Sequence, residues 1–319
     1  MKILKNIVML IGVLCIISTL IFAMQSDPQW VKELPTLDAE VGKDKNVADG
    51  YRITPIEIPA DLNFAGEMVP QDDPEIMERV DREFLVNTYW QSNALLLIKR
   101  ANQYFPIIEP ILKKNGIPDD FKYLAVAESG LQNVVSHAGA TGFWQIMKAT
   151  GKEYGLEVNS NVDERYHLEK STEVACQYLN RWKKRYGNWT LTASSYNAGP
   201  GAISKYLKIQ KVDDYYDLLL GQETGRYLFR IMAIKEILKN PEKYGFDIEE
   251  KDLYHAAPTH TVDIAKPVEN FADFAIENGI NYKILKRHNP WLRESHLNNK
   301  SGKKYTLEIP KKGYYKVSN

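Results

Sequence analysis

Apolar residues recur at helical spacing along most of the chain after about residue 75. Residues at i, i+3, i+4 and i+7 share one face of a helix, so this period predicts amphipathic helices packed around a core. No stretch of residues 76–254 alternates like a multi-stranded sheet, and we predict an all-helical domain over that range. The expected helices lie within 93–116, 118–129, 168–187, 191–207 and 223–240.

The ends of these helices carry ordinary stop and start signals. Breaks occur at 116–118 and at 187–188, where Gly can end a helix in a left-handed conformation and Pro cannot continue one. Asp119 or Asp120, and Asn188, are expected to cap the helices that follow, because short polar side chains accept hydrogen bonds from the first free amides.

The pattern changes after Tyr254. Residues 255–319 contain a strand-like THTVDI, two short helical stretches and a strand-like YTLEIP, which together predict a small β-α-α-β unit. Residues 256–319 carry 11 Lys/Arg against 6 Asp/Glu. This positive excess would favour an anionic polymer, although scattered lysines are more often a solvated surface.

The N-terminal part differs from both. Lys2 and Lys5 precede an apolar run that has no charge until Asp27, which is typical of an export signal. We expect residues 1–23 to be either a cleaved signal peptide or a membrane anchor, and the protein to lie in the cell envelope or periplasm. Residues 24–75 hold 12 acidic and 4 basic side chains and several prolines, which predicts an extended acidic stalk.

Composition excludes some classes of function. Lys+Arg and Asp+Glu both number 41, and no basic repeat is present, so we expect no nucleic-acid partner. The histidines lack spaced Cys, His or acidic partners, so we expect no metal, and no motif points to a cofactor. Cys176 is the one cysteine after the export signal and is expected to be a buried, small apolar side chain.

Glu128 is the first candidate for chemistry. The helical stripe through Phe121, Leu124 and Ala125 continues to Glu128, which therefore falls among apolar neighbours. Burial disfavours the charged form, so its pKa should be raised. The helix ends at once in Ser129-Gly130, and small residues follow that let a backbone turn tightly and leave an open cleft beside the acid.

Polar and aromatic residues accompany this acid in the sequence. Ser136, Gln145 and the Tyr196-Asn197 pair supply hydroxyl, amide and phenol groups. Sugars need such partners for their hydroxyls and flat rings for their CH faces. The neighbouring rings that we expect to fill this second role are Phe143, Trp144 and Trp189.

Four motifs occur in a characteristic order: Glu128-Ser129-Gly130, SHAGATGFWQIMKATG, SSYNAGPGAISKY and ETGRYLFRIMAIKEI. In order and spacing they resemble the family 1 lytic transglycosylases, goose-lysozyme-like enzymes that cut peptidoglycan, and most of all their membrane-bound type D branch. The resemblance covers about residues 85–250. It implies a mainly α fold, in which a lysozyme-like all-helical catalytic domain spans 76–254.

The resemblance also implies roles for individual residues. Glu128 would be the catalytic acid/base that protonates the glycosidic oxygen and then takes the proton of the C6 hydroxyl of muramic acid, giving a 1,6-anhydro sugar. Ser136, Gln145, Tyr196 and Asn197 would position the acid or the saccharide. Glu223 would open a segment that closes the far side of the groove, although a first-turn helix acid stabilised by the helix dipole is the simpler interpretation.

Two other functions stay open. A goose-type lysozyme would hydrolyse the same bond with a water molecule and would need a second carboxylate, for which Asp163 and Glu164 are candidates by residue type. A silent peptidoglycan-binding protein could keep the same fold. The 255–319 unit resembles a LysM glycan-binding module, but residues 265–268 replace the polar turn usual after its first strand. A packing module is therefore as good an interpretation as a glycan-binding one.

Overall fold

The computed structural model describes residues 53–316. The predicted signal or anchor at 1–23 and most of the predicted stalk lie outside the described residues. The helical part contains β1 (Asn63–Phe64), β2 (Glu67–Met68), α2 (Pro74–Tyr89), α3 (Gln91–Lys114), α4 (Phe121–Ser129), α5 (Lys148–Glu153), η2 (Glu164–Tyr166), α6 (Leu168–Tyr186), α7 (Trp189–Ala198), α8 (Pro200–Gln210), α9 (Gln222–Lys239), η3 (Pro241–Tyr244) and η4 (Glu250–Asp252). The C-terminal part contains β3 (Thr259–Ile264), α10 (Phe271–Glu277), α11 (Tyr282–His288) and β4 (Tyr305–Pro310).

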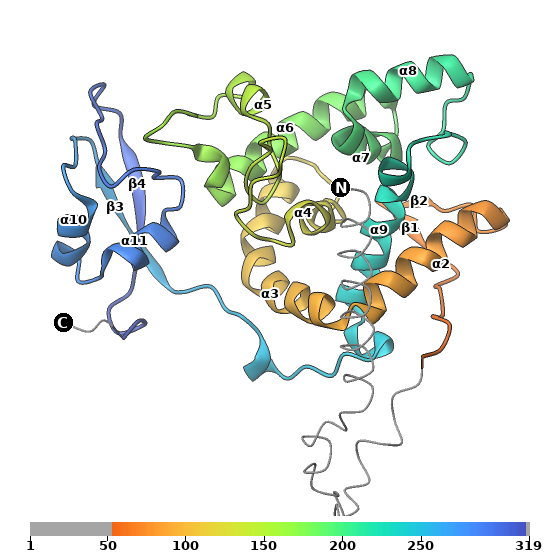
Figure 1. The fold of residues 1–319 in the computed structure, drawn as a ribbon, viewed down its shortest axis with the longest axis horizontal. Coiled ribbons are helices and arrows are strands. Elements are labelled where there is room, and N and C mark those ends of the chain that lie inside the picture. Colours follow the sequence, from red (N-terminus) through yellow and green to blue (C-terminus); the bar gives the residue numbers. More distant parts are fainter. Residues whose placement is uncertain (1–52, 317–319) are drawn as a thin grey trace, which may run out of the picture. The chain divides into compact units, whose positions relative to one another are not determined.

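Helix α9 is the centre of the helical part (Figure 1). It packs against α2, α3, α4 and α7, and ten of its residues are buried, including the run from Tyr227 to Phe229. A helix that is apolar on most of its faces must be surrounded by other elements, and α9 has that character. The predicted mainly α fold is confirmed. Each expected helix is present, except that the stretch 191–207 belongs to two helices, α7 and α8, which separate at Gly199.

The caps agree in part with expectation. The Asn188 side chain accepts a hydrogen bond of 2.9 Å from the Leu191 amide and caps α7 as predicted. Asp120 stands at the start of α4 but makes no side-chain cap. Its carboxylate instead accepts hydrogen bonds of 2.7 Å from the Ala65 amide and from the buried ammonium of Lys235. Asp120 therefore joins the β1–β2 hairpin to α9.

The acidic stalk ends earlier than predicted. Leu62 and Phe64 are 1% and 0% exposed and belong to the core of the helical part. Phe64 packs edge-on against Phe121, with ring centroids 5.0 Å apart. The prediction of a stalk up to residue 75 is therefore wrong for its last part, because these two apolar side chains are buried among helices that come much later in the sequence.

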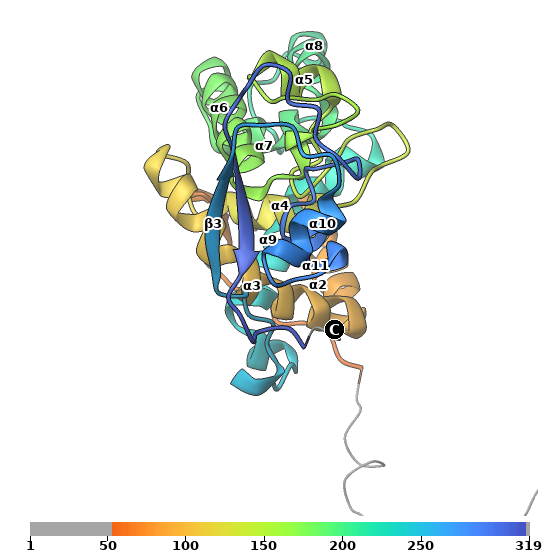
Figure 2. The same cartoon turned by 90° about the vertical axis from the view of Figure 1, so that its left-hand side faces the viewer.

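The C-terminal part is the predicted β-α-α-β unit. β3 and β4 pair antiparallel, with Thr259 opposite Pro310 and Ile264 opposite Tyr305. α10 and α11 lie on the same face of this two-stranded sheet (Figure 2). The unit has its own cluster of buried apolar residues, which includes Phe271, Leu285 and Leu307, and it also takes in Val162 from the helical part.

A segment of the helical part, residues 157–167, carries the contacts to this unit. The Asp163 amide donates to the Trp291 carbonyl and the Arg293 amide donates to the Asn161 carbonyl, each at 2.9 Å. Lys303 and Tyr305 both bond to the Glu157 carboxylate.

Within residues 53–316, no helix combines the length and the apolar character that crossing a membrane requires.

Candidate active site

Glu128 lies in the last turn of α4. Phe121, Leu124 and Ala125 are fully buried, as the apolar stripe predicted, while Glu128 is only partly covered. Gly130 ends the helix with φ of +59°, a left-handed conformation that Gly adopts without the cost that a Cβ brings. The chain therefore leaves the helix immediately after the acid, which keeps one side of the carboxylate accessible.

The charge state of Glu128 is set first by burial and then by side chains of α9. Burial raises the pKa of the carboxyl from an ordinary 4.5 to about 7, although a hydrogen bond from Tyr227 and the positive charge of Arg230 lower it. The negative charge of Glu223 contributes to the rise, and the value of about 7 is the net of all these effects. The Tyr227 hydroxyl donates to Oε1 of Glu128. Glu128 is therefore an acid that holds its proton near neutral pH, as the sequence predicted.

Two more candidates come from α7. The Tyr196 hydroxyl donates a hydrogen bond of 2.6 Å to the Trp144 carbonyl, and burial together with the charge of Glu128 raises its pKa well above the usual value. The side-chain oxygen of Asn197 accepts a hydrogen bond of 2.9 Å from the Thr224 hydroxyl. Tyr196 thus lies near Glu128, and Asn197 is tied to the start of α9 next to Glu223.

Ser136 and Gln145 belong to the loop between α4 and α5. The exposed Ser136 hydroxyl accepts a hydrogen bond of 3.0 Å from the Ala140 amide. The amide nitrogen of Gln145 donates to the carbonyls of Val134 and Gly142. Both side chains therefore shape the loop itself, and any contact with a saccharide would be made from its exposed side.

The aromatic side chains do not form the expected stacking surface. Phe143 and Trp144 are 4% and 0% exposed, and the Trp144 ring nitrogen donates a 2.8 Å hydrogen bond to the Thr172 hydroxyl. Trp189 packs edge-on against Phe121. The predicted role in sugar stacking is wrong for Phe143 and Trp144, because both rings are buried in the core of the helical part. Trp189 is half-buried against that core, and its role stays a prediction.

Asp163 and Glu164 are engaged elsewhere. The Asp163 carboxylate makes two bonds to Arg165, of 3.0 and 2.7 Å, and Glu164 pairs with Lys170 at 2.5 Å. Both acids are buried and belong to the 157–167 segment that contacts the C-terminal unit. A buried carboxylate that is paired in this way supports structure and is unavailable to activate water, which removes both candidates for a second catalytic carboxylate.

Tyr227 and Arg230 were missed as site residues by sequence reasoning. Both lie in the ETGRYLFRIMAIKEI motif, at four and seven residues after Glu223. That spacing puts all three on one face of a helix, which was the signal available in the sequence.

Cys176, on α6, is fully buried as predicted, and burial raises the pKa of its thiol to about 12.

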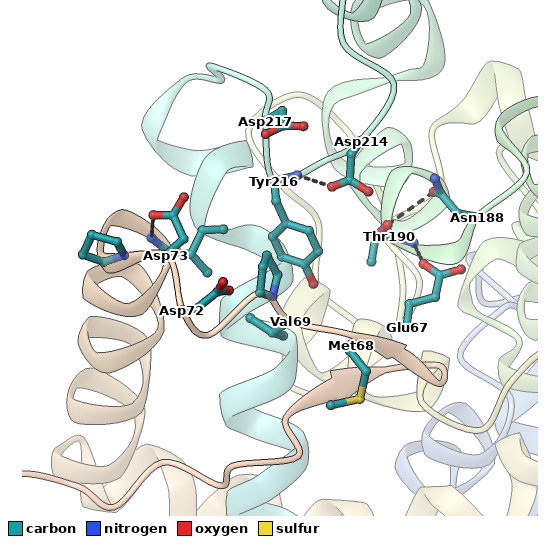
Figure 3. A pocket seen from close by; sticks show the side chains of 13 residues that line it. Glu67, Met68, Val69, Asp72, Asp73, Asn188, Thr190, Asp214, Tyr216 and Asp217 are labelled. Atoms are coloured by element: carbon teal, nitrogen blue, oxygen red, sulfur yellow. Dashed lines mark hydrogen bonds between the residues drawn. The ribbon is translucent and has the colours of Figure 1, made fainter.

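A separate pocket of about 890 Å³ lies between the β1–β2 hairpin, α2 and the loop before α9 (Figure 3). Its lining includes several carboxylates but not Glu128. The Glu67 carboxylate accepts hydrogen bonds from the first two amides of α7, and Asp73 caps α2. These acids therefore serve the helix ends. Within residues 53–316, no group of three or more His, Cys, Asp or Glu is arranged to hold a metal.

Comparisons with known proteins match two parts of this chain to family models. Residues 105–219 match the family model of the transglycosylase SLT domain, and residues 260–313 match that of the soluble lytic transglycosylase C-terminal LysM-like domain. The chain is 33% identical over 250 residues to membrane-bound lytic murein transglycosylase D of Escherichia coli K12, covering 76% of this chain and 53% of the relative. It therefore spans about half the length of that curated relative.

Two weaker similarities were found. A putative tributyltin chloride resistance protein of Alteromonas is 25% identical over 122 residues, which are 38% of this chain and 56% of that protein. The solved structure of an inactive mutant of the lytic transglycosylase Slt from Pseudomonas aeruginosa aligns with a TM-score of 0.37 and 19% identity. That alignment covers 48% of this chain and 26% of the other.

Proposed function

We infer, from a chain that carries a transglycosylase SLT domain and a LysM-like C-terminal domain, that this protein is a peptidoglycan lytic transglycosylase. It would cut the β-1,4 bond between N-acetylmuramic acid and N-acetylglucosamine and leave a 1,6-anhydro-muramic acid end. The observation that carries the proposal is Glu128, a single carboxylic acid that burial keeps protonated near pH 7 at the accessible end of a helix.

The proposed reaction uses this acid twice. The Glu128 proton moves to the glycosidic oxygen as the bond to C1 of muramic acid breaks, and the substrate's N-acetyl group stabilises the cationic carbon. The Glu128 carboxylate then accepts the C6 hydroxyl proton while that oxygen bonds to C1. Because the acid is regenerated and no water is consumed, one carboxylate suffices where other glycosidases use two.

Tyr227 determines which oxygen of Glu128 carries the acidic proton. Its hydroxyl donates to Oε1 of Glu128, so the acidic proton of the neutral form resides on Oε2. The same hydrogen bond would stabilise the carboxylate that forms after proton transfer. We propose that Tyr196 supports the acid from α7, that Ser136, Gln145 and Asn197 contact the saccharide, and that Glu223 borders the groove at the start of α9.

The wider assignments follow from the same interpretation. We propose export to the cell envelope, with residues 1–23 as a cleaved signal or a membrane anchor, and glycan strands as the partner. We also propose a catalytic domain that ends near residue 254 and a LysM-like domain from residue 255. The relative in Escherichia coli is described as membrane-bound and supports the envelope assignment.

The test is mass spectrometry of the products released from purified peptidoglycan sacculi by the full chain. Muropeptides with 1,6-anhydro-muramic acid ends are expected from the native protein and from Glu242→Gln, an exposed control. They should be absent with Glu128→Gln. Reducing ends would instead identify a goose-type hydrolase, with Glu223 as the remaining candidate for the second carboxylate. If folded native protein released no muropeptides, the remaining interpretation would be a peptidoglycan-binding protein without activity.

A further inference from the structure

Glu83 is a buried carboxylate that the proposed mechanism does not use. It lies on α2, and its side chain is only 2% exposed. An isolated charge in such a place would cost several kcal/mol, so it must be paired. Arg82 contacts one carboxylate oxygen, and the Asn87 side chain lies 3.4 Å from the other.

Two arginines from α9 complete the surroundings of Glu83. The Nε atoms of Arg226 and Arg230 lie 3.8 and 3.6 Å from its carboxylate oxygens. These arginines are one helical turn apart, and Tyr227 follows Arg226 directly on the same helix. Glu83 therefore pairs with the same helix that binds Glu128 through Tyr227.

Arg230 connects the two acids. It pairs with Glu83, and its positive charge also acts on Glu128. The titratable and charged groups that face Glu128 are Glu223, Tyr227 and Arg230 from α9 and Tyr196 from α7. Arg100 from α3 donates to the Gly130 carbonyl at the end of the same helix. Those that face Glu83 are Arg82 from its own helix, Arg226 and Arg230 from α9, and Tyr215 from the loop before α9.

The sign of the effect follows from Coulomb's law. An uncompensated arginine near Glu128 would stabilise its carboxylate and strip the acid of its proton at neutral pH. A negative charge paired with that arginine cancels much of its field. We propose that Glu83 is a positioning residue that holds Arg230 against α2 and neutralises it, so that Glu128 remains a proton donor at neutral pH. This inference rests on the proposed function.

The test measures the titration of Glu128 directly. In the full chain labelled with ¹³C-glutamate, the Glu128 carboxyl signal is assigned by its absence in Glu128→Gln and followed against pH. In Glu83→Gln we expect its midpoint to fall by about 0.5–1 pH unit, at or below the lower end of the change that a contacting charge produces. The double variant Glu83→Gln/Arg230→Gln should return the midpoint towards that of the native protein.

Two further variants keep the test decisive. Arg230→Gln alone removes a positive charge that acts on Glu128, while Glu83 keeps its pairs with Arg82 and Arg226. It should move the midpoint upward, which provides a result even if Glu83→Gln folds poorly. Arg82→Gln removes a different ion pair of Glu83 without freeing Arg230, and it should not lower the midpoint. An unchanged midpoint in folded Glu83→Gln, or a downward shift in Arg230→Gln, would overturn the proposal.

Activity gives a second, separable measurement. If the chain cuts peptidoglycan, the pH at which kcat/KM declines on the alkaline side should fall in Glu83→Gln by the same amount as the titration midpoint, and the double variant should recover it. If the native chain forms no product, the proposed function fails while the titration still decides whether Glu83 sets the charge of Glu128. A purely structural Glu83 would lower activity equally at all pH values.

Discussion

The position of Glu128 has a thermodynamic cost that can be measured without substrate. Its pKa is about 7 in the folded protein against an ordinary 4.5, so the folded state resists ionisation of this group more than the unfolded chain does. As pH rises above 4.5, the unfolded chain releases the proton first, and the folded state loses relative stability until Glu128 ionises near pH 7. A buried acid of this kind therefore destabilises the folded protein near neutral pH.

Replacing Glu128 with Gln should remove that cost. We expect Glu128→Gln to match the native stability at pH 4 and to exceed it above pH 7 by up to about 3 kcal/mol, because a tenfold change in the proton-binding constant corresponds to about 1.4 kcal/mol. Denaturant unfolding from pH 4 to pH 8 measures the difference. Glu242→Gln, an exposed control, should show no such trend. A constant difference across this range would contradict the raised pKa.

Tyr227→Phe should separate orientation from acidity. The lost hydrogen bond favours the carboxylate, so the pKa of Glu128 should rise further. The turnover rate should fall by about tenfold or more, since a hydrogen bond to a charged group contributes roughly 1.5–3 kcal/mol. The alkaline limb of the pH–rate profile should move upward while kcat drops. A limb that moves downward would show that Tyr227 does not donate to the acid.

At the scale of elements, the buried Arg165 side chain is one of the groups that hold the loop between α4 and α5. Arg165 donates to the carbonyls of Gly139 and Ile146, at 3.0 and 3.1 Å, and is itself held by Asp163. The backbone of Gly142 lies against the backbone of Arg165, and a Cβ added at Gly142 would be 2.1 Å from the Arg165 carbonyl oxygen. The loop that carries Ser136 and Gln145 is thus fixed from the side of the 157–167 segment.

Gly142→Ala should therefore disturb this loop strongly. The backbone of Arg165 would have to move, and we expect a loss of about 2–4 kcal/mol in the free energy of unfolding. Gly139→Ala is the matched control, because Gly139 has the same φ of +84° and no atom within 4 Å of its added Cβ. Comparing the two melting curves isolates the clash from the backbone strain. Equal losses would mean that Arg165 does not press on this turn.

What the sequence could predict depended on the kind of signal. The helical period of apolar residues predicted the end of α6 to within one residue, because the buried face of a helix repeats along its whole length. It could not say how deep Trp144 lies, because a ring in a loop has no period and its partner Thr172 is 28 residues away. Phe64 was taken for stalk for the same reason, since its partners lie beyond residue 120.

At the scale of the whole molecule, Glu157 joins the two described parts. Burial alone would raise its pKa, but hydrogen bonds from Lys303 and Tyr305 outweigh this and hold the pKa below its ordinary 4.5. A lowered pKa means that the contact contributes fully above pH 4.5 and is lost as pH falls through the lowered value. The contact between the C-terminal unit and the 157–167 segment should therefore weaken in acid.

Glu157→Gln should loosen this contact without unfolding either part. We expect faster hydrogen exchange at the amides of Asp163 and Arg293, which bond across the contact, and unchanged exchange in the β3–β4 ladder. Mass spectrometry of exchanged peptides measures both. Glu153→Gln, an exposed acid that pairs with Arg181, is the control and should alter neither. Faster exchange in the ladder itself would show that Glu157 supports the unit as a whole.

The position of Val162 matters for any attempt to produce the C-terminal unit as a separate domain. Although it comes nearly a hundred residues before β3, it is 1% exposed and sits in the apolar cluster of the C-terminal unit. If the unit were excised at residue 255, the apolar side chains that now contact Val162 would be exposed to solvent. The isolated unit, or a fusion that carries it, should therefore tend to aggregate. A version of the unit that folds on its own would need the 157–167 segment supplied with it.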